Sequence, residues 1–271
     1  MASVCRINSS CRRSGSLAPV TSPGVRWLIA ALVALSSTAA GCADTHGPVV
    51  ITADDSVVPE QLRTAYRTDA ARLALRELIE RSDPALNDIE LPNQDVERFY
   101  DALIRVYNFR HPARDAVVET HSIHTLPHPS VHYLSLVLTP PTWAEAWRPG
   151  ERLTGDPAVD SLVLGHDLEL EHYYDGASFG DLVTLFSPKA INVTALAVQF
   201  ELIDGVRWAS GQEIIGDGND IAAEGDTRLD LRYSVGYGDC PSGCLHRHWW
   251  RFRIGDDGSV EYLGSWGDPL P

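Results

Sequence analysis

The feature that most constrains the fold is a pair of segments near the carboxyl end in which apolar residues alternate with polar ones. Residues 228–237 and 244–254 both show this period of two, and a Gly-rich turn joins them. Successive side chains of a strand point to opposite faces, so each segment predicts a strand that buries one face only. Together with residues 259–266 they predict a three-stranded antiparallel meander within residues 211–271.

Residues 116–210 carry a different pattern, in which helical and extended segments alternate. They predict strand, helix, strand, strand, helix and strand, which is the βαββαβ order of the ferredoxin-like fold. Asp156 and Asn192 are expected to cap the two helices. Two amphipathic helices within residues 59–110 precede this unit. We therefore predict an α+β fold, with a single domain over residues 59–271.

The first 41 residues have the composition of a secretory signal peptide. They contain four arginines and no acidic residue, and their wholly apolar run, residues 27–35, is followed by small residues. This run is too short to cross a bilayer as a helix, so it predicts a leader at residues 1–41 that is removed after export. The mature protein then begins at Cys42.

Residues 39–42 read Ala-Ala-Gly-Cys and resemble the lipobox of bacterial lipoproteins. The resemblance implies acyl chains such as palmitate on Cys42, and several chains on one residue meet the requirement for stable membrane anchoring. The alternative is an ordinary signal peptide with Cys42 incidental. Residues 42–58 lack periodicity and predict a tether. We expect a domain anchored in the bacterial cell envelope, outside the cytoplasm, with the outer membrane favoured because Ala43 replaces the aspartate associated with inner-membrane retention.

The cysteines that remain after export and lipidation form a single pair. Cys5 and Cys11 leave with the leader and Cys42 carries lipid, so Cys240 and Cys244 are the two left. Disulfides form and persist in oxidising compartments such as the bacterial periplasm. The sequence therefore predicts one bridge across a tight loop.

The charge of the mature chain excludes some partners. Removal of the leader's four arginines leaves 18 basic residues against 37 acidic ones, a formal net charge of about −19. A field of this sign repels nucleic acid, so we expect no nucleic-acid partner. Contact with the membrane is expected through the lipid anchor.

One face of the predicted meander is rich in arginine, which is unusual in an acidic chain. Strand parity places Arg232, Arg247, Trp249, Arg251 and Arg253 on the face opposite the apolar one. Guanidinium groups suit carboxylate, phosphate or sugar-acid groups, so this face is a candidate binding surface for an envelope protein or an anionic glycan. The alternative is cross-strand pairing with acidic residues, among them Asp230 and Glu261.

Two groups of residues are weak candidates for metal binding. Asp217 and Asp220 belong to Gly-Asp-Gly-Asn-Asp, which is similar to one unit of a calcium-binding roll, but such rolls need stacked copies. His246 and His248 follow the cysteine pair with spacing that could be drawn as a zinc site. A polar turn and a disulfide explain the same residues without metal, so we expect no cofactor, with zinc or calcium as alternatives.

The chain from about residue 108 onward resembles a family of secreted bacterial proteins and lipoproteins. The resemblance is carried by the Gly-Asp-Gly-Asn-Asp motif and by residues 238–252, which read Gly-Asp-Cys-Pro-Ser-Gly-Cys, then Arg-His-Trp-Trp-Arg-Phe from residue 247. The family is itself uncharacterised. The resemblance implies an extracytoplasmic domain and no particular activity.

Three functions from different classes remain open. The chain contains no complete catalytic set, which favours a non-catalytic, membrane-anchored envelope lipoprotein that binds a partner. A metal-dependent hydrolase of the cell envelope is the second hypothesis, motivated by the ten histidines. The third, a protease inhibitor similar to protease propeptides, rests on analogy with the βαββαβ topology alone.

Overall fold

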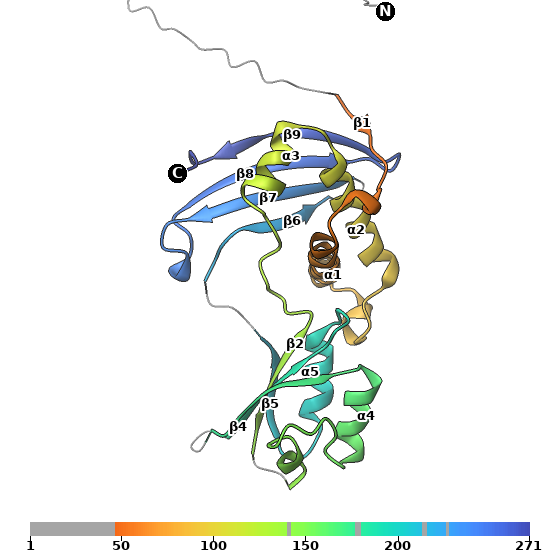
Figure 1. Ribbon diagram of the computed structural model, residues 1–271, viewed down its shortest axis with the longest axis vertical. Coiled ribbons are helices and arrows are strands. Elements are labelled where there is room, and N and C mark those ends of the chain that lie inside the picture. Colours follow the sequence, from red (N-terminus) through yellow and green to blue (C-terminus); the bar gives the residue numbers. More distant parts are fainter. Residues whose placement is uncertain (1–46, 140–141, 177–179, 213–215, 226–227) are drawn as a thin grey trace, which may run out of the picture. The chain divides into compact units, whose positions relative to one another are not determined.

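The computed structural model describes residues 47–139, 142–176, 180–212, 216–225 and 228–271 (Figure 1). The chain divides into two compact units, residues 1–42 and 43–271, and every described element belongs to the second. The predicted leader and Cys42 lie outside the described residues. The second unit has an α+β fold with two antiparallel sheets, as predicted.

The two predicted amphipathic helices open the domain. Helix α1 spans Glu60–Arg81 and ends where Ser82 adopts a left-handed conformation, and helix α2 spans Asn93–Asn108. The cap position of α2 is Pro92, and no side chain forms a capping hydrogen bond there. A short helix α3, Pro112–Asp115, follows.

The middle of the chain forms a four-stranded sheet with two helices. The elements in chain order are β2 (Tyr133–Leu138), α4 (Pro157–Gly165), β3 (Glu169–Tyr174), β4 (Asp181–Phe186), α5 (Val193–Glu201) and β5 (Val206–Gly211). The strands lie in the order β3-β4-β2-β5, and every pair is antiparallel. Apolar residues of α4 and α5 pack into one core with the inward side chains of these strands.

Both helices of this unit begin at the caps that the sequence predicts. Asp156 accepts hydrogen bonds from the backbone N–H groups of Ala158 and Val159, and Asn192 accepts one from that of Ala195. Each side chain satisfies donors that have no partner inside the helix. Local capping chemistry therefore fixes where α4 and α5 start.

The carboxyl-terminal part forms a sheet of five strands, where the sequence predicted three. The predicted meander is β7 (Leu229–Tyr237), β8 (His246–Ile254) and β9 (Ser259–Gly267). Strand β6 (Asp220–Glu224) extends one edge, and β1 (Val49–Val50) pairs with β9 at the other, in the order β1-β9-β8-β7-β6.

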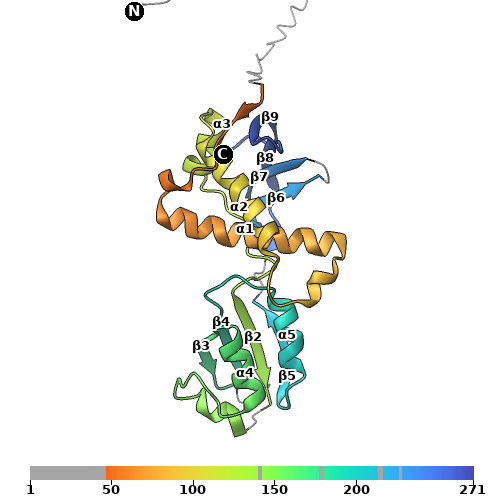
Figure 2. The same ribbon diagram turned by 90° about the vertical axis from the view of Figure 1, so that its right-hand side faces the viewer.

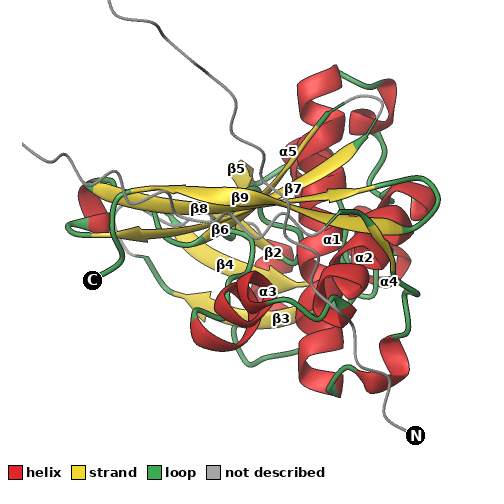
Figure 3. Ribbon diagram, turned by 90° about the horizontal axis from the view of Figure 1, so that it is seen from above, coloured by secondary structure: helices red, strands yellow, loops and turns green. Residues whose placement is uncertain are grey.

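One face of the five-stranded sheet packs against the helices, and no helix formed by the described residues lies on the other. Figures 2 and 3 show α1, α2 and α3 on the same side of this sheet. At the centre of the buried face, the Phe252 ring contacts the rings of Phe109, Tyr233 and Tyr262, with centroids 5.4–6.4 Å apart. The alternation in the sequence thus marks the side of each strand that enters this core.

The fold begins earlier than the predicted tether of residues 42–58 suggests. Besides the pairing of β1 with β9, the Ile51 backbone N–H donates to the carbonyl oxygen of Gly258 at 3.0 Å. The Asn108 side-chain amide donates to the carbonyl oxygens of Thr52 and Asp54. Residues from Val49 onward are therefore part of the domain, and six residues, 43–48, lie between Cys42 and β1 in the sequence.

Truncation of Phe252 should destabilise the whole domain. The side chain has no exposed surface, so Phe252→Ala removes apolar contacts and leaves a cavity that costs about 3–5 kcal/mol of unfolding free energy. Leu263→Ala, on a side chain 36% exposed in β9, is the control and should cost less than about 1 kcal/mol. Urea denaturation followed by circular dichroism measures both, and equal losses would contradict this account of the core.

Candidate functional site

The uncovered face of the five-stranded sheet carries the residues that we call the arginine face: Arg232, Arg247, Trp249, Arg251 and Arg253. The register of β7 and β8 pairs Arg232 with Arg251, and Ser234 with Trp249. Directly paired residues point to the same side of a sheet. The structure therefore brings these five side chains together, on the face that parity indicates.

Carboxylates neutralise most of this arginine face. Glu224 lies 2.5 Å from Arg232 and 3.5 Å from Arg251, and Asp230 lies 2.7 Å from Arg251 and 2.8 Å from Arg253. The hydrogen bond from Arg253 to Asp230 raises the pKa of this guanidinium further above its ordinary value. Cross-strand pairing, the alternative considered for these arginines, is thus present, and it alternates positive and negative charge across the surface.

Two tryptophans lie beside the paired charges. Trp249 of β8 and Trp266 of β9 face each other across the two strands with nearly parallel rings, centroids 6.0 Å apart and planes 12° apart. The Trp266 side chain is 43% exposed. Arg251 pairs with Gly264, which has no side chain to cover it. The face thus presents indole surface next to guanidinium and carboxylate groups.

The two motifs that carry the family resemblance meet at the end of this sheet. The Asp217 backbone N–H donates to the carbonyl oxygen of Cys240, and its carboxylate lies 2.5 Å from the Arg247 guanidinium. Burial is the largest single effect and raises the pKa of Asp217. The hydrogen bonds from Arg247 and from the Gly218 backbone, together with the charge of Arg247, outweigh it, so this pKa lies below its ordinary value. The Cys240 and Cys244 sulfurs lie within bonding distance, as predicted, and close the turn before β8.

The four weak metal candidates contact protein groups in the structure. Asp217 pairs with Arg247, Asp220 pairs with Arg76, and the Nδ1 atoms of His246 and His248 each contact Asp268, one at the carboxylate and the other at the carbonyl oxygen. Within the described ranges, no group of three or more His, Cys, Asp or Glu residues is arranged to hold a metal ion. The structure does not bring the candidates together as one ligand set.

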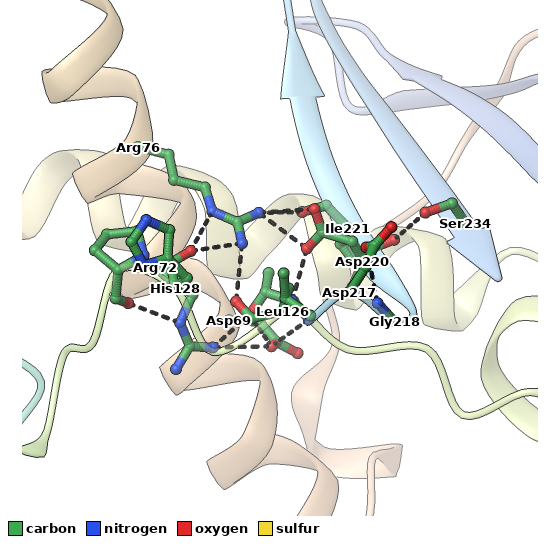
Figure 4. A network of polar contacts seen from close by, with 12 residues as sticks. Asp69, Arg72, Arg76, Leu126, His128, Asp217, Gly218, Asp220, Ile221 and Ser234 are labelled. Carbon is green, nitrogen blue, oxygen red and sulfur yellow. Dashed lines mark hydrogen bonds and ion pairs between the residues drawn. The ribbon is translucent and has the colours of Figure 1, made fainter. Parts of the chain in front are cut away.

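A polar network beneath the sheet was missed by the sequence analysis (Figure 4). Asp69 of α1 is almost fully buried, and its carboxylate accepts hydrogen bonds from the backbone N–H and the hydroxyl of Thr125 at 2.9 and 2.6 Å. Its other oxygen lies 2.6 Å from Nδ1 of His124. The hydrogen bond to Asp69 raises the pKa of His124, against the opposing effect of burial.

Arg76 extends the network to the β6 edge of the sheet. Its guanidinium donates to the Asp220 carboxylate at 3.0 Å and to the backbone carbonyl oxygens of Leu126, His128 and Ile221. The Leu126 backbone N–H donates to Asp220 in turn. The network therefore ties α1, the loop before β2 and β6 together. Asp69 and Arg76 are seven residues apart on one helical face, which is the signal that could have revealed them.

His132 lies in a different environment from His124. Its Nδ1 lies 2.8 Å from the carbonyl oxygen of Ser187, and its Nε2 lies 3.0 Å from the Thr68 hydroxyl. Burial lowers the pKa of His132, although the hydrogen bond to Ser187 opposes this. Nδ1 must donate to the carbonyl, so Nε2 of the neutral ring accepts from Thr68.

Comparisons with known proteins do not assign this site. No protein-family model, no curated protein and no solved structure matches the chain. No helix among the described residues is long and apolar enough to cross a bilayer. The function is therefore argued from the geometry of the arginine face and its surroundings.

The two histidines should affect stability with opposite dependence on pH. The raised pKa of His124 means that its contribution is present below about pH 6.5 and is lost as pH rises through the folded-state pKa. The lowered pKa of His132 means that its contribution is present above about pH 6.5 and is lost as pH falls. Unfolding free energies of the wild type, His124→Gln and His132→Gln, measured by urea denaturation across this range, test the signs.

The wild-type advantage over His124→Gln should shrink as pH rises, and the advantage over His132→Gln should grow. Each variant is the control for the other, because both remove one imidazole from the same loop. Advantages that change in the same direction with pH would contradict the assignment.

Proposed function

We propose that this protein is a non-catalytic lipoprotein of the bacterial envelope that binds a glycan through the arginine face. The observation that carries the proposal is a sheet face that no described helix covers, on which partly exposed indole rings adjoin paired charges (Figure 2). Aromatic rings contact the apolar faces of sugars, and guanidinium and carboxylate groups bond to their hydroxyls. The arginine face offers both kinds of contact on adjacent strands.

The charge balance of the face indicates the kind of glycan. Arg247, Arg251 and Arg253 contact Asp217 or Asp230, and Arg232 contacts Glu224. A polyanion would have to displace these carboxylates, and the net negative charge of the chain would also repel it. A glycan that carries isolated acid groups keeps the pairs and adds hydrogen bonds to guanidinium protons that remain free. We therefore infer an oligosaccharide with few acid groups per chain rather than a polyanionic one.

Removal of an indole should weaken glycan binding without unfolding the domain. Trp266→Ala should reduce affinity about tenfold or more, because an aromatic anchor at a binding surface contributes at least about 1.4 kcal/mol. Trp208→Ala on β5 is a matched control, since Trp208 is 47% exposed and Trp266 is 43% exposed. An array of neutral and uronic-acid oligosaccharides selects the probe, and titration calorimetry with that oligosaccharide measures the affinity.

The arginines provide a second arm of this test. Arg251→Ala should weaken binding of the uronic-acid oligosaccharide more than binding of its neutral counterpart. The variant leaves Asp230 paired with Arg253, so the sheet keeps one of its two contacts there. An array on which the wild type binds nothing, or equal affinity of Trp266→Ala and the wild type, would remove this face from consideration.

The lipid anchor is supported by residues 39–42 and has its own test. Cys42→Ala removes the only sulfur that would carry the acyl chains, so the protein should move from the membrane fraction to the soluble fraction. Labelling with radioactive palmitate should mark the wild type and leave the variant unlabelled. Mass spectrometry of a mature amino terminus without acyl chains would contradict the anchor.

We also infer that residues 131–211 form a ferredoxin-like unit. The chain order β2, α4, β3, β4, α5 and β5, the sheet order β3-β4-β2-β5 and the common core of the two helices support this. In that arrangement the first and third strands occupy the centre of the sheet. None of its residues belongs to the arginine face, so the unit is separate from the proposed glycan site.

A further inference from the structure

We propose that the surface around β1 docks onto the lipid headgroup layer of the membrane that holds the protein. We define this β1 surface by Val49, Val50, Val57 and Arg110. It lies where the spacer from Cys42 enters the fold, and the inference rests on the proposed lipid anchor. The observations that carry it are the length of the spacer, the exposure of the valines and the Arg110 guanidinium, which has no partner among the described residues.

The spacer is too short to hold the β1 surface far from the membrane. Only residues 43–48 separate Cys42 from β1. An extended chain spans at most about 3.5 Å per residue, so Val49 can lie no more than about 25 Å from the lipidated residue. Because β1 pairs with β9, this end of the chain is fixed to the sheet. Of the whole domain, the β1 surface is therefore the part whose distance from the lipids the anchor limits most tightly.

Apolar side chains are exposed around the point of attachment. Val49, Val50 and Val57 are 45%, 68% and 60% exposed. Two hollows of about 500 and 370 Å³ flank β1, and both are lined by Ile51, Asn108 and Arg110. Lipid headgroups and the upper acyl chains can fill hollows of this kind and cover the valines.

Arg110 supplies a positive charge that no described residue of the protein neutralises. It is exposed and forms no hydrogen bond or ion pair within the described part of the chain, whereas its neighbour Arg114 contacts Asp115 and Glu119. Guanidinium groups bind phosphate with two parallel hydrogen bonds. Asp54 also borders one hollow, but its carboxylate accepts two hydrogen bonds from Ser56. A lipid phosphate is the ligand that suits Arg110 here.

Docking of the β1 surface depends on the lipid anchor, and the docked surface sets the orientation of the domain on the membrane. Three valines and one arginine are too few to hold an acidic protein on an anionic bilayer against its own charge. A lipid on Cys42 converts this weak contact into an intramolecular one, at high effective concentration. The acidic remainder of the domain is then directed away from the lipids, and the arginine face is left accessible to glycans.

A fluorescent label at Val57 reports directly on docking. Once Cys42 is acylated and Cys240 is paired with Cys244, an introduced cysteine is the only free thiol of the mature chain. We would label Val57→Cys with an environment-sensitive dye and reconstitute the full lipidated protein in vesicles of phosphatidylethanolamine and phosphatidylglycerol at a ratio of three to one. Quenching by a nitroxide lipid should be several-fold stronger than for Leu164→Cys, because Val57 and Leu164 are 60% and 58% exposed in the free domain.

A longer spacer distinguishes docking from mere proximity. Insertion of about twenty Gly and Ser residues after Thr45 releases the domain from the reach of the short spacer. If the surface is docked, the dye at Val57→Cys keeps most of its quenching in this variant. Adding Arg110→Glu should then reduce that quenching several-fold. Quenching that disappears with the long spacer alone would overturn the proposal.

The same samples separate this proposal from the proposed anchor. Wild-type protein that does not sediment with the vesicles would refute the lipid anchor. Protein that sediments while the labels at Val57 and Leu164 are quenched equally would refute docking and leave the anchor standing. Shielding of Val57 that rises with protein concentration in the absence of vesicles would assign the surface to a second copy of the chain, and would also overturn docking to lipid.

Discussion

The contact between Arg76 and Asp220 is the interaction on which the arrangement of the domain depends. It joins the carboxyl-terminal half of α1 to the first residue of β6, and the same guanidinium binds the backbone of the loop that leads to β2. Both side chains are about three-quarters buried, and hydrogen bonds to charged groups contribute about 1.5–3 kcal/mol each. Loss of Arg76 would leave the Asp220 carboxylate without its cation and would remove a hydrogen bond from three carbonyl groups at once. Together with the pairing of β6 to β7, this contact sets the position of β6, and with it Glu224 on the arginine face.

The same pairing of charges gives the acidic chain its open sheet face. A sheet face that no described helix covers is in contact with water and must therefore be polar. Long side chains with opposite charges on adjacent strands make it polar and also cover the backbone. Asp230 is almost fully buried beneath Arg251 and Arg253, so this pair of contacts is more than a screened surface interaction. The ion pairs of the arginine face therefore stabilise the sheet. The groups that remain for binding a ligand are the indoles and the guanidinium N–H groups that the carboxylates leave free.

Local chemistry explains which parts of the fold could be predicted from the sequence. Asp156 and Asn192 bond to N–H groups two and three residues away, so the starts of α4 and α5 are encoded in a few neighbouring residues. The β7 and β8 strands are long enough for alternation to identify the buried face. The two-residue β1 and the five-residue β6 are too short to show a period, and tertiary contacts place both. Because the sequence analysis did not predict β6, it did not place Glu224 beside the arginines. The positions of the arginines were predicted correctly, but this partner was not.

The Gly-Asp-Gly-Asn-Asp motif shows why residue types alone did not separate a ligand site from a structural turn. Calcium requires several oxygen atoms directed at one point. Here the Asp217 carboxylate bonds to Arg247, the Asn219 side-chain oxygen accepts from the Gly236 backbone, and Asp220 bonds to Arg76. The three side chains diverge toward different partners, because the turn must join β6 to the disulfide loop and to α1. The motif has the composition of a metal site and the geometry of a structural junction, and only the positions of distant arginines decide between them.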